Sequence, residues 1–243
     1  MVRFSARASR MRNGGGDMRD LEGVTVVFDL DGTLVDTAPD LLRVLGVVMA
    51  EEGLGAPPYA ETRLMVGQGA RALIERSAAA HGVVWPDAKA IALTERFVEI
   101  YAADIARLSK PFEGALAALD GLALEGATLA VCTNKRTGLS VQLLETLGMA
   151  ARFTAIVGAD AVPARKPDPG HYLAAVKAAG GVVTRSVMVG DSTADITAAR
   201  AARAPSIAVR FGYCEEGVDT LGADIVIDHF DALGGAVRRL INV

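Results

Sequence analysis

Short apolar runs rich in β-branched residues alternate with helical patterns along most of this chain, and this alternation limits the folds it can adopt. The first run, VTVVFDL at residues 24–30, is apolar on both faces up to Asp29, apart from Thr25. Such a run is typical of a strand buried within a parallel sheet. Strands that alternate with helices predict βαβ units, and therefore an α/β fold with a doubly wound, Rossmann-like parallel sheet. Further strands are predicted at residues 128–133, 155–158, 186–190, 206–209 and 223–227, and helices at 140–147, 171–179 and 196–202.

One long segment interrupts the alternation. Residues 39–110 contain helical patterns but no buried-strand run, and the apolar positions between Ile91 and Ile105 recur at three- and four-residue steps. This spacing predicts amphipathic helices. We therefore expect a small helical domain at 39–110, inserted into a core domain that comprises 21–38 and 111–243.

Composition excludes several classes of protein. The 243 residues include 25 Lys and Arg against 29 Asp and Glu, which gives a net charge of −4 and a pI near 5.5. A general nucleic-acid binder would be basic, so no nucleic-acid partner is expected. Neither a membrane-spanning stretch nor enough cysteines for a disulfide framework is present, Cys132 and Cys214 being the two cysteines. A cytoplasmic protein without a membrane partner is predicted.

The first 20 residues differ from the rest. They carry five arginines and the run Gly14-Gly15-Gly16, and they lack apolar periodicity. We expect a disordered tail, since termini are poorly ordered by default. A transit peptide and an overlong gene start, with Met18 as the true start, are the alternatives.

Paired acids follow two of the predicted strands. Asp29 and Asp31 come at the end of the first strand, directly before Gly32, which permits a sharp turn. Asp191 follows the strand at 186–190, and Asp195 comes four residues later. Ligands of open α/β sheets bind beyond the carboxyl ends of the strands. A group of acids there offers only oxygen ligands, which suits Mg²⁺ together with a substrate phosphate.

Two further strand ends carry groups that suit a phosphate. Thr133 and Asn134 end the strand TLAVCT and can donate hydrogen bonds to phosphate oxygens, although either could instead cap the next helix. Lys166 lies in the stretch RKPDP, after the strand at 155–158. It is a candidate counter-charge for a phosphate and an aspartate, or else part of a charged surface loop.

In this order, DxDGT, a strand-end hydroxyl, a lysine and GDxxxD make the chain resemble the haloacid dehalogenase-like superfamily of Mg²⁺-dependent phosphohydrolases, from Val24 almost to the C-terminus. Within that superfamily the stretches DLDGTLVDTAPDL, VGQGARALIERS, TNK and RKPDP are similar to phosphoglycolate phosphatases. The stretch SKPFEG departs from that pattern, in which a second proline more often precedes the glycine. The helical insert is similar to the small helical cap of the superfamily.

The resemblance implies a role for each signature residue. Asp29 would be the nucleophile that forms an aspartyl-phosphate, and Asp31 would donate and then accept a proton. Mg²⁺ would be held by Asp29, the Asp31 backbone carbonyl and Asp191, with Asp195 one shell further out. The phosphate would be bound by Gly32, Thr133, Asn134 and Lys166.

The insert is expected to act as a hinged cap, with joints near Pro39 and Lys110–Pro111. Its residues Gly67, Gln68, Gly69 and Arg71 are candidates to contact the end of the substrate that lacks the phosphate, although a plain helix-breaking turn would look the same. The three histidines receive no role.

The predicted substrate is a small phosphorylated metabolite, above all 2-phosphoglycolate, and the predicted protein is a monomer or a homodimer. A phosphosugar mutase or sugar-phosphate phosphatase of the same superfamily is the main alternative. A haloacid dehalogenase would need neither a metal nor an acid at Asp31. A phospho-acceptor signalling module would be about half as long and would lack the insert.

Overall fold

The computed structural model of the chain describes residues 2–3, 20–214 and 217–241. Its centre is a sheet in which β2 (Thr25–Phe28) lies between β5 (Thr128–Cys132) and β7 (Ser186–Gly190), parallel to both. The sheet continues through β6 (Ala155–Val157) beyond β5, and through β8 (Ser206–Val209) and β9 (Ile225–Ile227) beyond β7. All of these pairs are parallel, so the predicted doubly wound α/β fold is confirmed.

One edge strand was not predicted. Val2–Arg3 forms β1, which pairs antiparallel with β6. The predicted disordered tail covers residues 1–20, and residues 1 and 4–19 lie outside the described part of the chain. Within the described ranges, no helix is long and apolar enough to cross a membrane.

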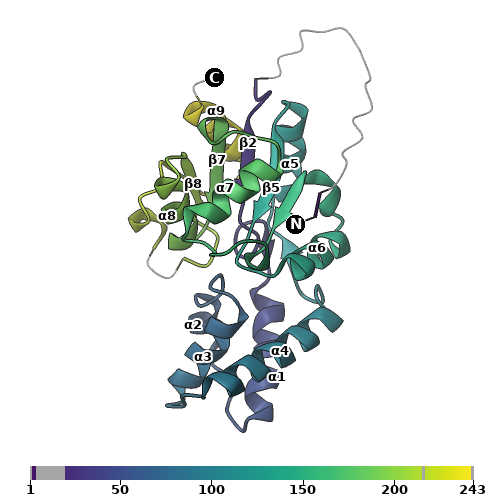
Figure 1. Ribbon diagram of the computed structural model, residues 1–243, viewed down its shortest axis with the longest axis vertical. Coiled ribbons are helices and arrows are strands. Elements are labelled where there is room, and N and C mark those ends of the chain that lie inside the picture. The colour runs from purple at the N-terminus through teal and green to yellow at the C-terminus, as the bar shows by residue number, and fades with distance from the viewer. Residues whose placement is uncertain (1, 4–19, 215–216, 242–243) are drawn as a thin grey trace.

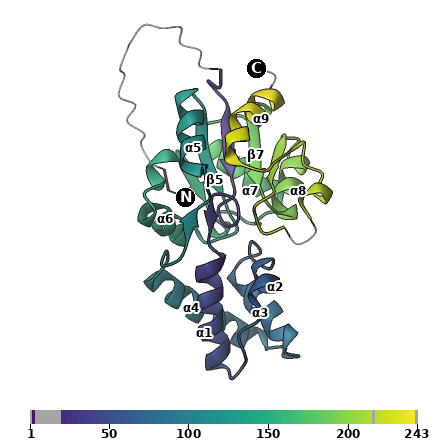
Figure 2. The same ribbon diagram turned by 180° about the vertical axis from the view of Figure 1, so that it is seen from behind.

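Helices cover both faces of the sheet because successive strand side chains point to opposite sides. Val27 packs with residues of α7 and α8 on one face, whereas Val26 and Phe28 pack with α5, α6 and α9 on the other. Figure 1 shows α7 and α8 in front of the strands, and Figure 2 shows α5 and α9 from behind. The helices are α5 (Ala115–Leu124), α6 (Thr137–Thr146), α7 (Pro169–Ala178), α8 (Thr193–Ala201) and α9 (Leu233–Leu240). Short 3₁₀ turns occupy Ala150–Arg152, Ala159–Ala161, Val183–Arg185, Val218–Thr220 and Phe230–Ala232.

The inserted segment folds as a group of helices at one end of the sheet (Figure 1). Here α1 and α4 bury apolar faces, with Val44 and Leu45 on α1 and Phe97 and Tyr101 on α4. Proline in the first turn of α1 suits a helix start, since its missing N–H has no helical partner there. The helices are α1 (Ala38–Glu51), α2 (Tyr59–Arg63), α3 (Ala70–Ala80) and α4 (Asp87–Ala103).

The chain enters and leaves this segment side by side. The two connections form a small ribbon, in which β3 (Val35–Asp36) pairs antiparallel with β4 (Lys110–Pro111). Next to it, Oδ2 of the buried Asp40 accepts hydrogen bonds from the N–H groups of Leu108 and Ser109 and from the Ser109 hydroxyl, each at 2.8 Å. The carboxylate therefore fastens the returning connection to the start of α1.

Candidate active site

Three carboxylates meet at the carboxyl ends of two neighbouring strands. Asp29 follows β2 and Asp191 follows β7, and the parallel register of these strands brings both to one edge of the sheet. Asp195 lies in the first turn of α8, which begins just beyond. One oxygen from each of the three carboxylates lies within 4.8 Å of the others, and all three residues are buried.

Asp191 is held by both of its carboxylate oxygens. The Thr33 hydroxyl donates to Oδ1 and the Tyr213 N–H donates to Oδ2, each at 2.7 Å. Gly32 packs against the same carboxylate, since a Cβ there would lie 2.3 Å from Asp191 Oδ2, and its φ of +88° also favours glycine. Burial, followed by repulsion from Asp195, raises the pKa of Asp191 to about 7.

Asp195 has a donor on each oxygen as well. The Ser192 N–H at 3.0 Å and the Ser192 hydroxyl at 2.6 Å donate to Oδ2, which completes a capping box at the start of α8. The Lys166 ammonium donates to Oδ1 at 2.6 Å. Asp195 is therefore placed to orient Lys166, and its predicted position one shell behind the metal ligands stays a prediction.

Lys166 connects this cluster to the nucleophile candidate. Its Nζ lies 2.8 Å from Asp29 Oδ1 and also donates to the Cys132 carbonyl at 2.6 Å. Burial lowers the pKa of Lys166, but the carboxylates of Asp195 and Asp29 raise it by more, so the ammonium stays charged. Among the described residues, this lysine is the one hydrogen-bonding or ionic partner of the Asp29 carboxylate, and Oδ2 of Asp29 carries no such contact.

The Asp29 carboxylate lies in a negatively charged environment. Burial raises its pKa, Lys166 lowers it, and Asp195 and Asp191 raise it again, so that the net pKa lies well above its ordinary value. Within the described part of the chain, three buried carboxylates lie close together and are met by one ammonium, that of Lys166. A divalent cation would offset the remaining repulsion, and oxygen-only donors are what Mg²⁺ prefers. The residues present therefore fit a magnesium ion.

Asp31 has a partner that the sequence reasoning did not single out. The Lys135 ammonium contacts both Asp31 oxygens, and the Thr37 hydroxyl donates to Oδ1 at 2.7 Å. The ammonium also lies over the Tyr101 ring, 4.8 Å from its centroid. Burial lowers the pKa of Lys135, but Asp31 raises it by more. The stretch TNK contained this lysine, although only its threonine and asparagine were assigned roles.

Thr133 and Asn134 lie where β5 ends, as predicted. Thr133 is buried, and its hydroxyl accepts a hydrogen bond from the Lys135 N–H at 3.2 Å. The Asn134 amide donates to the carbonyls of Gly67 and Lys166, each at 3.2 Å, while its buried Oδ1 lacks a hydrogen-bond partner in the described chain. Asn134 thus bridges the helical segment and the sheet.

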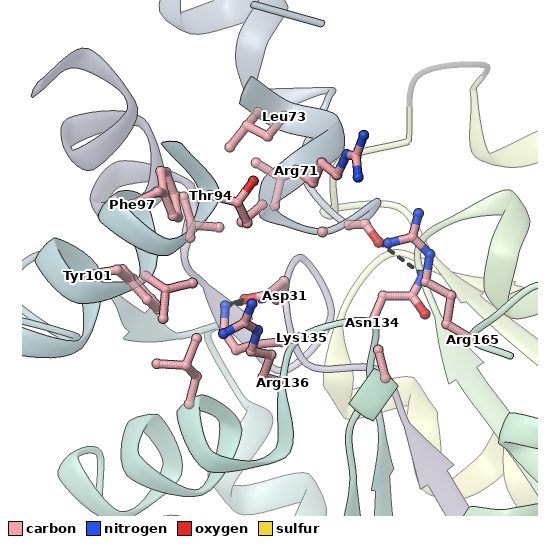
Figure 3. Close-up of a pocket in the computed structure, with 18 of the residues that line it drawn as sticks. Asp31, Arg71, Leu73, Thr94, Phe97, Tyr101, Asn134, Lys135, Arg136 and Arg165 are labelled. Atoms are coloured by element: carbon pink, nitrogen blue, oxygen red, sulfur yellow. Dashed lines mark hydrogen bonds and ion pairs between the residues drawn. The ribbon is translucent and has the colours of Figure 1, made fainter. Parts of the chain in front are cut away.

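A cleft of about 280 Å³ separates the helical segment from the sheet. Gly67, Gly69 and Arg71 line it together with Asp31 and Lys135, whereas Gln68 lines a smaller neighbouring cavity of about 80 Å³. Figure 3 shows the Arg71 guanidinium directed away from Asp31 and Lys135. That guanidinium is ion-paired within the helical segment, with Glu75 at 2.8 Å and with Asp87.

Further contacts join the helical segment to the core that the sequence does not predict. Arg136 donates to both carboxylate oxygens of Glu95 on α4 through its two terminal guanidinium nitrogens, and Gln142 donates to the Ala102 carbonyl at 2.8 Å. Arg63 of α2 lies over the Tyr213 ring, 4.8 Å from its centroid, and donates to the Phe211 carbonyl at 3.3 Å. No local pattern marks these residues, because each pair joins distant parts of the chain.

His171 also supports the site. Its Nδ1 accepts the backbone N–H of Lys166 at 3.2 Å, so Nε2 carries the hydrogen and donates to the Val157 carbonyl at 3.1 Å. Burial, followed by the charge of Lys166, lowers the pKa of His171 to about 4. The neutral imidazole therefore holds the backbone at Lys166.

Comparison with known proteins identifies the family. The family model of haloacid dehalogenase-like hydrolases matches residues 26–209. The phosphoglycolate phosphatase of Caulobacter vibrioides is 52% identical over 213 residues, which are 88% of this chain and 90% of the relative. That of Agrobacterium fabrum is 47% identical over 211 residues, 87% of this chain and 91% of the relative.

A solved structure shows the same fold. It is described as a predicted phosphoglycolate phosphatase from Haemophilus somnus 129pt, with 24% identity and a TM-score of 0.81 over 92% of this chain and 99% of that chain. This likeness shows the fold, while the family match and the two relatives confirm the predicted resemblance to the superfamily. The chain belongs to the haloacid dehalogenase-like hydrolases and is a phosphatase of that family.

Proposed function

We propose that the chain is a Mg²⁺-dependent phosphomonoester hydrolase that acts on 2-phosphoglycolate through an aspartyl-phosphate on Asp29. The observation that carries the proposal is the contact of the buried Asp29 carboxylate with Lys166, beside Asp191 and Asp195. The relatives at 52% and 47% identity bear the name of this activity.

The metal would be held by Asp29, Asp191 and the backbone carbonyl of Asp31. When bound, Mg²⁺ neutralises phosphate charge, so that an anionic nucleophile can approach. Asp195 has protein donors on both oxygens, which supports its role as the residue that orients Lys166. Lys166 in turn orients Asp29 and offers positive charge to the phosphoryl group.

The first half-reaction transfers the phosphoryl group to the protein. A carboxylate oxygen of Asp29 forms a bond to phosphorus while the bond from phosphorus to the substrate oxygen breaks. Asp31 gives its proton to that departing oxygen, so glycolate leaves as the alcohol. Thr133 and the backbone at Asn134 donate to the phosphoryl oxygens.

The second half-reaction returns the enzyme to its starting state. Asp31, now a carboxylate, takes a proton from a water molecule as that water attacks phosphorus. The bond between phosphorus and Asp29 breaks, and inorganic phosphate leaves. The contacts of Arg136 with Glu95 and of Asn134 with Gly67 hold the helical segment over the cleft, where it limits access of water during the first half-reaction.

A phosphate-release assay over small phosphomonoesters tests the proposal. We expect 2-phosphoglycolate to give a higher kcat/KM than glycerol phosphates, hexose phosphates or nucleotides, and chelation with EDTA to stop turnover until Mg²⁺ is restored. Asp29→Asn should abolish turnover while the protein stays folded, because an amide cannot attack phosphorus. Release of phosphate by Asp29→Asn would contradict the aspartyl mechanism, and release in EDTA would contradict the dependence on Mg²⁺. A better sugar-phosphate substrate, or isomer formation in place of phosphate release, would favour the phosphosugar alternatives.

A further inference from the structure

Four cationic side chains of the described residues line the cleft between the helical segment and the sheet, and they differ in whether a carboxylate of the protein already pairs with them. Lys135 is paired with Asp31, Arg136 with Glu95, and Arg71 with Glu75 and Asp87. The fourth is Arg165, whose guanidinium forms no ion pair or hydrogen bond with any residue that the structure describes.

Arg165 occupies a defined place at the edge of this cleft. It directly precedes Lys166, whose ammonium lies 2.8 Å from Asp29 Oδ1. Its guanidinium lies beside Gly69 on the facing loop, where a Cβ would come within 2.9 Å of Nη1. Figure 3 shows Arg165 next to Asn134, extending from the core loop towards that facing loop. Glycine at position 69 therefore leaves the space that the guanidinium fills.

The charged side chains that line the cleft determine which cation is available to bind a second anionic group on a substrate. The acids that line it are already engaged, Asp31 with Lys135 and Asp160 with the N–H and hydroxyl of Thr137. A carboxylate that enters the cleft away from the phosphate needs a cation, because an anion stripped of water is costly unless it is matched. Only Arg165 among the four lining cations offers a guanidinium without a carboxylate partner in the described residues.

We propose that Arg165 binds the carboxylate of the substrate and thereby selects phosphomonoesters of small hydroxy acids. This inference rests on the proposed function and adds the residue that distinguishes its substrate class. A planar guanidinium can meet a carboxylate with two parallel hydrogen bonds, which a lysine cannot do. Arg71, the residue expected from the sequence, would first have to leave its pairs with Glu75 and Asp87.

Arg63 is less well placed for this role. It lies over the Tyr213 ring and is not among the residues that line the cleft.

The test compares Arg165 with Arg71 and uses Arg185 as the matched control. Arg185 is an exposed arginine outside the cleft that donates to the Glu22 carbonyl.

The experiment measures kcat and KM for 2-phosphoglycolate and for p-nitrophenyl phosphate, whose leaving group has no carboxylate. Arg165→Gln should raise KM for 2-phosphoglycolate at least about tenfold, since hydrogen bonds to charged groups are worth that much or more. It should change kcat/KM for the aryl phosphate by no more than about twofold, as an exposed substitution does. Arg165→Lys should recover part of the loss.

Arg71→Gln and Arg185→Gln should leave both substrates within about twofold of wild type. Equal losses on both substrates, an unchanged KM in Arg165→Gln, or the large selective loss in Arg71→Gln would each overturn the role of Arg165. Wild-type turnover of 2-phosphoglycolate separately tests the proposed function. Preserved thermal midpoints will show that the variants are folded.

Discussion

The Lys135 ammonium lies 2.9 Å from Oδ1 of Asp31 and 3.0 Å from Oδ2, so it contacts both oxygens of the carboxylate. The same ammonium lies over the ring of Tyr101, which belongs to α4 of the helical segment. Asp31, the candidate proton donor, is therefore linked through the Lys135 side chain both to the core sheet and to the helical segment that covers it.

Replacing Asp31 tests its proposed proton transfer. Asp31→Asn should slow hydrolysis of alkyl phosphates by about 10²–10⁴-fold, the usual contribution of a general acid. Aryl phosphates should lose much less, because their leaving groups need little protonation. The measurement is kcat/KM for 2-phosphoglycolate and for p-nitrophenyl phosphate in wild type and variant. Equal losses on both would mean that Asp31 only shapes the site.

The pairing of Asp31 with Lys135 should also be visible in stability. Both side chains are more than nine-tenths buried, so Lys135→Met leaves a buried carboxylate without its cation. Breaking such a pair typically costs about 3–5 kcal/mol of unfolding free energy. In urea unfolding, the double variant Asp31→Asn with Lys135→Met should lose less than the sum of the single variants. Strict additivity would show that the two residues do not interact energetically.

Much of the fold could be predicted because it depends on local pattern. The apolar runs around Val27 and Val189 indicate strands buried on both faces, and parallel strands bring their carboxyl ends to one edge. For this reason Asp29 and Asp191 could be expected near each other before the structure was known. Their catalytic and metal-binding roles stay predictions.

The helices and strands that were not predicted lack a local sequence pattern of this kind. Helix α5, with the sequence ALAALDGLAL, is apolar almost throughout and so shows no clear amphipathic period. Helix α9 is amphipathic, but it has only eight residues and begins with two glycines after its first leucine, and glycine disfavours a helix. The β3–β4 ribbon has two residues in each strand. The contact of Asp31 with Lys135 joins residues 104 positions apart, and no local signal specifies such a pair.

Asp40 offers a test of the connection between the two parts of the protein. Burial raises its pKa, but hydrogen bonds from Leu108, Ser109 and Arg43 lower it by more, so the net pKa lies below 3.8. Asp40→Ala should lower the unfolding free energy by about 2–4 kcal/mol at pH 7, since three hydrogen bonds to Oδ2 are lost.

The pH dependence of this loss has a definite sign. A carboxyl whose folded pKa is depressed stabilises the fold above its unfolded pKa, and that contribution disappears as pH falls through the folded pKa. The gap between wild type and Asp40→Ala in urea unfolding should therefore shrink below about pH 4. Asp104→Ala is the control, because Asp104 is half exposed and only weakly paired with Arg43. A gap that stays constant down to pH 3 would contradict the assignment.

His171 should make the fold sensitive to acid in a higher range. Its folded pKa of about 4 lies below the ordinary 6.5 because of burial and the charge of Lys166. The unfolded chain therefore binds one more proton between these values, and stability falls as pH drops from about 6.5 towards 4. Between pH 7 and pH 5 wild type should lose about 2 kcal/mol of unfolding free energy through this group. The variant His171→Asn should lack this loss of unfolding free energy. The acids of the site are present in both proteins, so their contribution cancels when the two proteins are compared. Urea unfolding at the two pH values measures it, and an equal pH dependence in both proteins would show that His171 is not held neutral against Lys166.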